Sequence, residues 1–234
     1  MERRDFLAAC VGVTGAAALA ASAAARDGVA PRYHARTKLV DARHGPLRTA
    51  DLKSETNYVF QYPYAATPCF LLRLAGPAPP AAGLKREDGR AYDWIGGVGA
   101  DRRVVAFTAI CAHQLAYPTR EVSFIRYQSE GSATSAGRVI HCCADHSVYD
   151  PSAGARVVSG PAPQPLAAIV LEHDAKRDEL YALGTLGAEP FEAFFAKYEF
   201  RLATEYGGSK ARASVGAVSV VRELSDYCRN TIRC

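Results

Sequence analysis

The chain has 234 residues, a formal net charge of +4 at pH 7 and a hydrophobic content of 49%. Its basic residues form no concentrated stripe with interleaved aromatic side chains, so we expect no nucleic-acid partner. No internal repeat is evident, and only the first 25 residues and the Pro/Ala-rich turn at 76–83 are low in complexity, which argues against a repeat protein.

The first segment, 1–25, resembles a twin-arginine export signal. Arg3 and Arg4 are followed by Phe6 and Leu7 at the offsets of that signal, and an alanine-rich apolar stretch comes next. Because this route exports folded proteins, we expect a periplasmic product. The apolar stretch is also about long enough to span a bilayer, so its retention as a membrane anchor stays open.

Removal of this segment leaves about 210 residues, 26–234, enough for one domain or for a base domain that carries a small subdomain. Runs of β-branched and aromatic residues between turns predict strands, and two stretches have helical spacing. The predicted strands cover 57–62, 69–74, 103–110, 138–141, 168–173 and 179–183, and the predicted helices cover 191–198 and 220–232.

Two short motifs follow predicted strands, and each supplies one cysteine and one histidine. They are Cys111-Ala112-His113 and Cys143-Ala144-Asp145-His146. Two thiolates on one iron and two imidazoles on the other are the ligand set of a Rieske 2Fe–2S cluster. For this set to form, the tips of the two loops must meet.

The residues after the second motif strengthen this interpretation. Ser147-Val148-Tyr149-Asp150 comes directly after it, and Gly160-Pro161-Ala162-Pro163 follows a short distance later. The stretch from about Ile110 to Leu166 therefore resembles the cluster-binding subdomain of Rieske proteins. The resemblance implies one 2Fe–2S cluster in a subdomain at about 108–166.

The resemblance assigns roles to individual residues. It places Cys111 and Cys143 on one iron, and His113 and His146 on the other.

It also gives Ser147 and Tyr149 hydroxyls that donate to the cluster, and makes Gly160, Pro161 and Pro163 part of a stiff loop that covers it. The implied fold is all-β, with an antiparallel β-sandwich base domain, the small cluster-binding subdomain and a short C-terminal helix.

Three features depart from the family pattern. Respiratory members have a further cysteine in each loop and join the two by a disulfide, whereas this chain has Ala116 and Asp145 at those places. A carboxylate beside the cluster would lower its reduction potential and oppose the hydroxyl donors. The second loop is also one residue shorter than usual between His146 and Ser147, and a surface insertion around 131–135 lengthens the segment between the motifs.

Other assignments of these side chains stay open. Two cysteines and two histidines are also a common set for structural zinc. Cys142 and His141 adjoin the second motif. We expect Cys142 to be a buried strand residue and His141 to face the surface, rather than either to be a ligand. The disulfide pairing of Cys69, Cys142, Cys228 and Cys234 is not determined by the sequence.

A one-electron carrier is the function that these features favour, with a cytochrome or an oxidoreductase large subunit as redox partner, rather than a self-contained enzyme. Gln114 stands where quinol-oxidising relatives have an apolar residue, which disfavours quinol. The alternative is the Rieske subunit of a quinol-oxidising cytochrome bc complex with a retained anchor. A complete Rieske oxygenase is excluded, because only one histidine, His173, follows Leu166.

Overall fold

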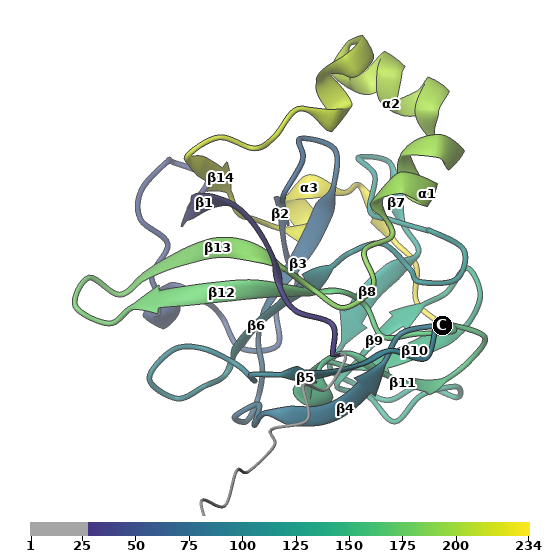
Figure 1. Ribbon diagram of the computed structural model, residues 1–234, viewed down its shortest axis with the longest axis horizontal. Coiled ribbons are helices and arrows are strands. Elements are labelled where there is room, and N and C mark those ends of the chain that lie inside the picture. Colours follow the sequence, from purple (N-terminus) through teal and green to yellow (C-terminus); the bar gives the residue numbers. More distant parts are fainter. Residues whose placement is uncertain (1–27) are drawn as a thin grey trace, which may run out of the picture.

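Strands are the main secondary structure in the computed structural model, which describes residues 28–234 (Figure 1). The predicted all-β fold is confirmed. The predicted export signal, 1–25, lies outside the described residues. Within 28–234, no helix combines the length and the apolar character needed to cross a membrane.

The largest sheet has eight strands, of which all neighbours are antiparallel except the first pair. Its order is β14 (Val218–Val220), β1 (Arg32–Val40), β13 (Glu179–Leu186), β12 (Ala168–Asp174), β6 (Val104–Thr108), β3 (Pro68–Arg73), β2 (Tyr58–Gln61) and β15 (Arg222–Glu223). Every predicted strand of the base domain is therefore present, with small shifts at the ends.

A separate antiparallel sheet of four strands lies beside it, in the order β11 (Arg156–Ser159), β10 (Ser147–Asp150), β9 (Val139–Cys142) and β8 (Ile125–Gln128). Two smaller pairs complete the strands: β4 (Ala81–Lys85) with β5 (Ala91–Trp94), and β7 (Val122–Ser123) with β16 (Asn230–Thr231). The helices are α1 (Phe191–Lys197), α2 (Glu199–Tyr206) and α3 (Leu224–Tyr227), with 3-10 turns at Thr49–Asp51, Pro151–Ala153 and Gly208–Arg212.

The large sheet buries side chains on both faces, because successive residues of a strand point to opposite sides. In β3, Phe70 and Leu72 pack into the core that also holds Cys111 and Cys142. Leu71, between them in sequence, belongs to a second core on the other face. The first core therefore joins the large sheet to the four-stranded sheet.

The C-terminal helix predicted at 220–232 is much shorter in the structure. Only Leu224–Tyr227 is helical. The backbone on either side pairs with strands instead: Arg222 lies opposite Val59 of β2, and Asn230 lies opposite Val122 of β7. Tertiary pairing with β2 and β7 therefore overrides the local helical spacing. The helix predicted at 191–198 is confirmed as α1.

Phe107 offers a test of the core that joins the two sheets. Its side chain is fully buried, and its ring centroid lies 5.7 Å from that of Trp94. We expect Phe107→Ala to lower the free energy of unfolding by about 3–5 kcal/mol, because it removes a large buried side chain and leaves a cavity. Chemical denaturation measures the change.

Phe200→Ala is the matched control, because this phenylalanine of α2 is 87% exposed. Its substitution should change the free energy of unfolding by no more than about 0.5 kcal/mol. Equal losses in the two variants would contradict the assignment of Phe107 to the core.

Candidate metal centre

The first motif lies on a tight loop that follows β6. Ala109, Ile110 and Cys111 are all fully buried, so the chain enters this loop inside the core. The loop is closed on itself: the Cys111 N–H donates to the Ala116 carbonyl at 2.9 Å, and the Leu115 N–H donates back to the Cys111 carbonyl at 3.0 Å. The fold therefore fixes Cys111 in the interior and presents His113 at the tip.

The helices α1 and α2 support this loop from outside (Figure 1). Ile110 and Tyr117 share a buried apolar cluster with the aromatic side chains of α1. The rings of Tyr117 and Phe194 meet edge to face, with their centroids 4.9 Å apart. Lys197 Nζ also donates to the Gln114 carbonyl at 2.6 Å. The first loop is thereby held by packing and a charged hydrogen bond.

The second motif forms the hairpin connection between β9 and β10. Cys142 pairs with Ser147 across the end of the hairpin, and only four residues lie between them. The His146 N–H donates to the Cys142 carbonyl at 2.7 Å, which tightens the turn. Cys142, the last residue of β9, is fully buried.

Four side chains from the two loops converge. One ligand atom from each of Cys111, Cys142 and Asp145 lies within 4.8 Å of the other two. Asp145 Oδ2 lies 3.1 Å from Cys111 Sγ and 3.1 Å from His113 Nδ1. The two sulfur atoms are buried, whereas the His113 side chain is 37% exposed. The site thus has a sulfur side facing the core and a histidine edge facing solvent.

Tyr149 lies beneath the first loop with its side chain fully buried. Its hydroxyl accepts a hydrogen bond from the Ala112 N–H at 3.1 Å and lies 3.3 Å from Cys111 Sγ. Because the oxygen accepts from the backbone, its own proton is free to be donated to the sulfur. The structure therefore places the Tyr149 hydroxyl beside a cysteine of the first motif; its donation to the cluster stays a prediction.

Electrostatics favour negative charge on Cys111 and Asp145. Hydrogen bonds from Cys142 and Tyr149 hold the pKa of Cys111 below its ordinary value, although burial opposes this. The same Cys111–Cys142 contact, together with burial, raises the pKa of Cys142. For Asp145, burial disfavours the charge, but the Ser147 N–H and the Cys111 contact outweigh it and keep its pKa below the usual range.

The proline loop lies against the second motif. The Ala162 N–H donates to Ser147 Oγ at 3.1 Å. Gly160 has a φ of +89°, and a Cβ there would come within 2.4 Å of the His146 carbonyl oxygen. Only glycine therefore fits this approach. Pro161 and Pro163 flank Ala162, so the Ala162 backbone contact places this loop beside the Ser147 hydroxyl; its role in covering a cluster stays a prediction.

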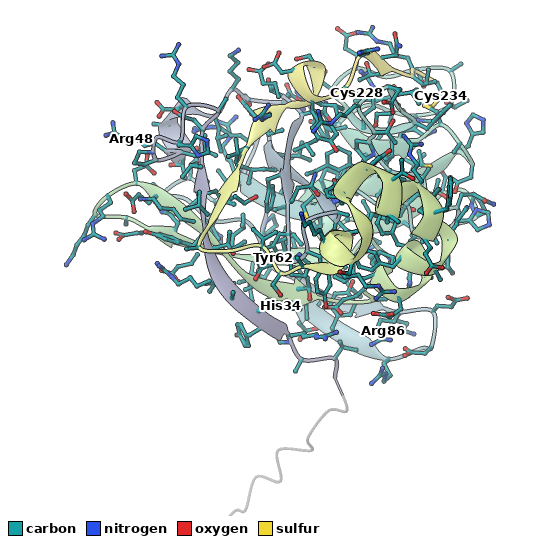
Figure 2. The ribbon with its side chains drawn as sticks, turned by 90° about the horizontal axis from the view of Figure 1, so that it is seen from above. His34, Arg48, Tyr62, Arg86, Cys228 and Cys234 are labelled. Carbon is teal, nitrogen blue, oxygen red and sulfur yellow. A yellow bond between two sulfur atoms is a disulfide. The ribbon has the colours of Figure 1, made fainter. Side chains whose placement is uncertain are left out.

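Two predicted ligands lie elsewhere. Cys143 Sγ forms a disulfide with Cys234. Cys234 is labelled in Figure 2, and the C mark in Figure 1 stands beside it. A sulfur in a disulfide is not a thiolate ligand, so in this state Cys143 cannot take the predicted role. His146 is exposed and is grouped with His141 and Cys234. The structure therefore unites Cys111 and His113 and separates them from Cys143 and His146.

Sequence reasoning placed Asp145 beside the cluster, but it did not connect Cys142 or Asp145 with the convergent group, and it placed His141 wrongly. Cys142 is buried, as expected, but it faces Cys111, and Asp145 is part of the convergent group. His141, expected at the surface, is fully buried, and neither of its ring nitrogens has a hydrogen-bond partner among the described residues. The signal that could have found Cys142 and Asp145 is the missing residue between His146 and Ser147.

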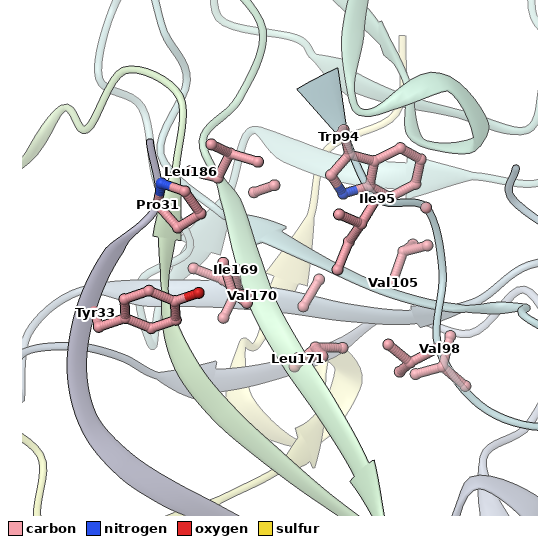
Figure 3. Close-up of a pocket in the computed structure, with 14 residues that line it drawn as sticks. Pro31, Tyr33, Trp94, Ile95, Val98, Val105, Ile169, Val170, Leu171 and Leu186 are labelled. Atoms are coloured by element: carbon pink, nitrogen blue, oxygen red, sulfur yellow. The ribbon is translucent and has the colours of Figure 1, made fainter. Parts of the chain in front are cut away.

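An apolar pocket of about 100 Å³ lies in another part of the molecule, against residues of β6 and β12, which pair at Phe107 and Ala168 (Figure 3). Its walls come from Tyr33, Trp94 and aliphatic side chains such as Ile169 and Leu186. It has no metal-ligating or ionisable side chain other than that tyrosine, so it is not the metal centre.

Comparisons with known proteins identify the family of the chain. The chain is 31% identical over 189 residues to the iodate reductase subunit IdrB of Pseudomonas sp. (strain SCT), and the match covers 80% of each chain. The chain belongs to the Rieske family of iron–sulfur proteins. No model of a protein family matches it.

Solved structures of Rieske proteins are also found by shape. The soluble domain of the Rieske protein II (soxF) from Sulfolobus acidocaldarius has a TM-score of 0.48 and 27% identity, over 68% of this chain and 81% of that one. The quaternary ammonium Rieske monooxygenase CntA, in complex with an inhibitor, has a TM-score of 0.31 and 14% identity, over 73% of this chain and 38% of that one.

The convergent residues fit the iron–sulfur cluster that Rieske proteins hold. Two buried thiols supply the soft donors that iron–sulfur clusters require, and an imidazole and a carboxylate supply nitrogen and oxygen donors beside them. The chain is thus a Rieske-type electron-transfer protein.

The disulfide between Cys143 and Cys234 closes a long segment, since the two residues are 91 positions apart. We expect Cys234→Ser to lower the free energy of unfolding by about 2–4 kcal/mol, because the unfolded chain regains the freedom that the cross-link removes. Denaturation of the variant and the parent protein measures the loss.

Cys228→Ser is a suitable control for this loss, because Cys228 is unpaired and lies close to Cys234 in the sequence. A smaller loss is expected there. A Cys234 variant as stable as the parent protein would contradict the disulfide.

The Tyr149 hydroxyl should tune the reduction potential of the loaded protein. We expect Tyr149→Phe to lower this potential, because the donor beside Cys111 stabilises the more negative, reduced state. A net loss of about 1 kcal/mol corresponds to roughly 40 mV for one electron. A spectroscopically monitored redox titration measures it.

Tyr127→Phe is the matched control, since Tyr127 is an equally buried tyrosine whose hydroxyl donates to Glu55. The reduction potential of Tyr127→Phe should equal that of the parent protein. Equal shifts in both variants would remove the special role of Tyr149.

Proposed function

We propose that this chain is a periplasmic one-electron carrier that holds one 2Fe–2S cluster and acts as the small subunit of an oxidoreductase. The observation that carries the proposal is the convergence of two buried thiols, an imidazole and a carboxylate at the tips of two loops above Tyr149. Such a donor set, on a member of the Rieske family, supports electron transfer.

The partner is proposed from the similarity to IdrB, which is named a subunit of iodate reductase. By analogy, we expect this chain to bind a larger catalytic subunit of an oxidoreductase that acts on an oxyanion. The site offers one polar contact surface, made by the exposed edge of His113 and by Gln114 beside it. A polar surface of this kind suits a protein partner better than a quinol.

When bound, the cluster accepts and releases one electron at a time. The chain supplies the surroundings for this step. Burial of Cys111 and Cys142 excludes water from the sulfur side. Tyr149 directs its hydroxyl at Cys111, and the exposed His113 gives a partner access to the other side. Electrons would therefore enter and leave along the histidine edge.

Export is proposed from two independent features. The segment 1–25 has the pattern of a twin-arginine signal. The disulfide between Cys143 and Cys234 is of a kind that persists in oxidising compartments such as the periplasm and is rare in the cytosol. The signal supports folding and cofactor insertion before export, and the disulfide supports an oxidising destination.

Metal analysis with electron paramagnetic resonance (EPR) tests the proposal. The full chain is purified under anaerobic conditions, its iron and zinc are quantified, and spectra are recorded before and after reduction with dithionite. We expect two irons per chain and an EPR signal that appears only on reduction and corresponds to one unpaired spin. Stoichiometric zinc without such a signal would overturn the electron-transfer proposal.

A further inference from the structure

We propose that Cys111, Cys142, His113 and Asp145 hold the cluster, so that a carboxylate replaces the second histidine of the usual Rieske ligand set. The inference rests on the proposed function and names the ligands of the same site. In this arrangement the two cysteines bind one iron, and the histidine and the aspartate bind the other. Cys143 and His146, which the sequence motif suggests, are not ligands.

The sulfur donors are decided by where each cysteine lies. Cys111 and Cys142 are both fully buried and unpaired, and each contacts the other's side chain. Cys143 follows Cys142 directly, but its side chain points away from Cys111. Its Sγ is bonded to Cys234 and lies 3.7 Å from the Ile232 carbonyl oxygen. Neighbouring residues at a strand end point in opposite directions, so only one of them can face Cys111.

Asp145 has the geometry of a ligand that binds through one oxygen. Its Oδ1 accepts a hydrogen bond from the Ser147 N–H at 2.9 Å, which fixes the carboxylate. Its Oδ2 is directed at both Cys111 Sγ and His113 Nδ1, at 3.1 Å each. A backbone donor that orients one oxygen while the other binds metal is the usual arrangement of a carboxylate ligand.

The burial of Asp145 also calls for a cation. Its side chain is 4% exposed, and among residues 28–234 its one ion-pair contact is His113, with no lysine or arginine in reach. A carboxylate buried without a full counter-charge is costly, and buried charges are commonly paired or bound to metal. Iron held between Cys111 and His113 would supply that charge.

The spacing of the second loop agrees with this assignment. If His146 is the ligand, the loop is one residue too short before Ser147, although Ser147 and Tyr149 lie where the family pattern needs them. If Asp145 is the ligand, the missing residue is restored. Cys142 and Asp145 then have the same separation, two intervening residues, as Cys143 and His146.

The ligand charges predict the redox behaviour. Loading removes the thiol protons of Cys111 and Cys142, so two thiolates and one carboxylate give the site three negative ligand charges. The usual Rieske set has two. Reduction adds one electron from a donor, here dithionite, and breaks no bond. The extra negative charge disfavours that electron, so the potential lies below that of the cluster with two histidines.

Pulsed EPR on the reduced full chain gives the direct test. This method detects the nitrogen atoms of histidines that are bound to iron. We expect one strongly coupled histidine nitrogen in the parent protein. In Asp145→His we expect two, together with a higher potential, because a neutral ligand replaces an anionic one. Two coupled nitrogens in the parent protein would overturn the proposal.

Matched variants separate the two ligand sets. Asp145→Ala and Cys142→Ser should lose the iron, whereas His146→Ala and the double variant Cys143→Ser/Cys234→Ser should keep two irons per chain. Circular dichroism of each variant establishes that it is folded. If His146→Ala and Cys143→Ser/Cys234→Ser lose the iron while Asp145→Ala and Cys142→Ser keep it, Cys143 and His146 are the ligands instead.

Metal analysis and pulsed EPR on these proteins also distinguish the ligand assignment from the proposed function. Iron in the parent protein with two coupled nitrogens contradicts the ligand assignment and leaves the electron carrier intact. Zinc, or no metal, in the parent protein and in every variant contradicts the electron carrier itself, and the ligand assignment with it.

Discussion

The meeting of two short loops over the hydroxyl of Tyr149 is the constraint on which the rest of the structure depends. One loop ends β6 of the large sheet, and the other joins β9 to β10 of the small sheet, so the two sheets must be held at a fixed distance. The shared core of Phe70, Leu72 and the residues around Cys111 does this. A rigid interior thereby places side chains that the chain order separates by about thirty residues.

The sequence predicts most of the fold because its strands are runs of apolar, β-branched and aromatic residues between turns. The segments at 57–62 and 168–173 form strands close to their predicted bounds. The prediction fails near the C-terminal end, where apolar residues at helical spacing pair with β2 and β7 instead. Strand pairing there depends on partners more than one hundred residues away, which no local pattern reports.

The site divides in the same way. Cys111, His113 and Tyr149 were predicted from the motif, and the structure places Tyr149 beside Cys111, and His113 on the same closed loop as Cys111. In the second loop two adjacent cysteines compete for one position. The direction of each side chain follows from the register between β9 and β10, and a shift of one residue reverses it. The motif alone therefore could not choose between Cys142 and Cys143.

The loops are supported by different kinds of interaction, which has a practical consequence. Packing of α1 holds the first loop, whereas the disulfide between Cys143 and Cys234 holds the residue next to the buried thiol of the second. Thiol reductants, often added to protect cysteines during purification, act on a disulfide and leave aromatic packing untouched. Preparations made with and without such a reductant are therefore chemically different proteins. The first loop is held by the same packing in both, whereas the second loop lacks its disulfide in the reduced preparation.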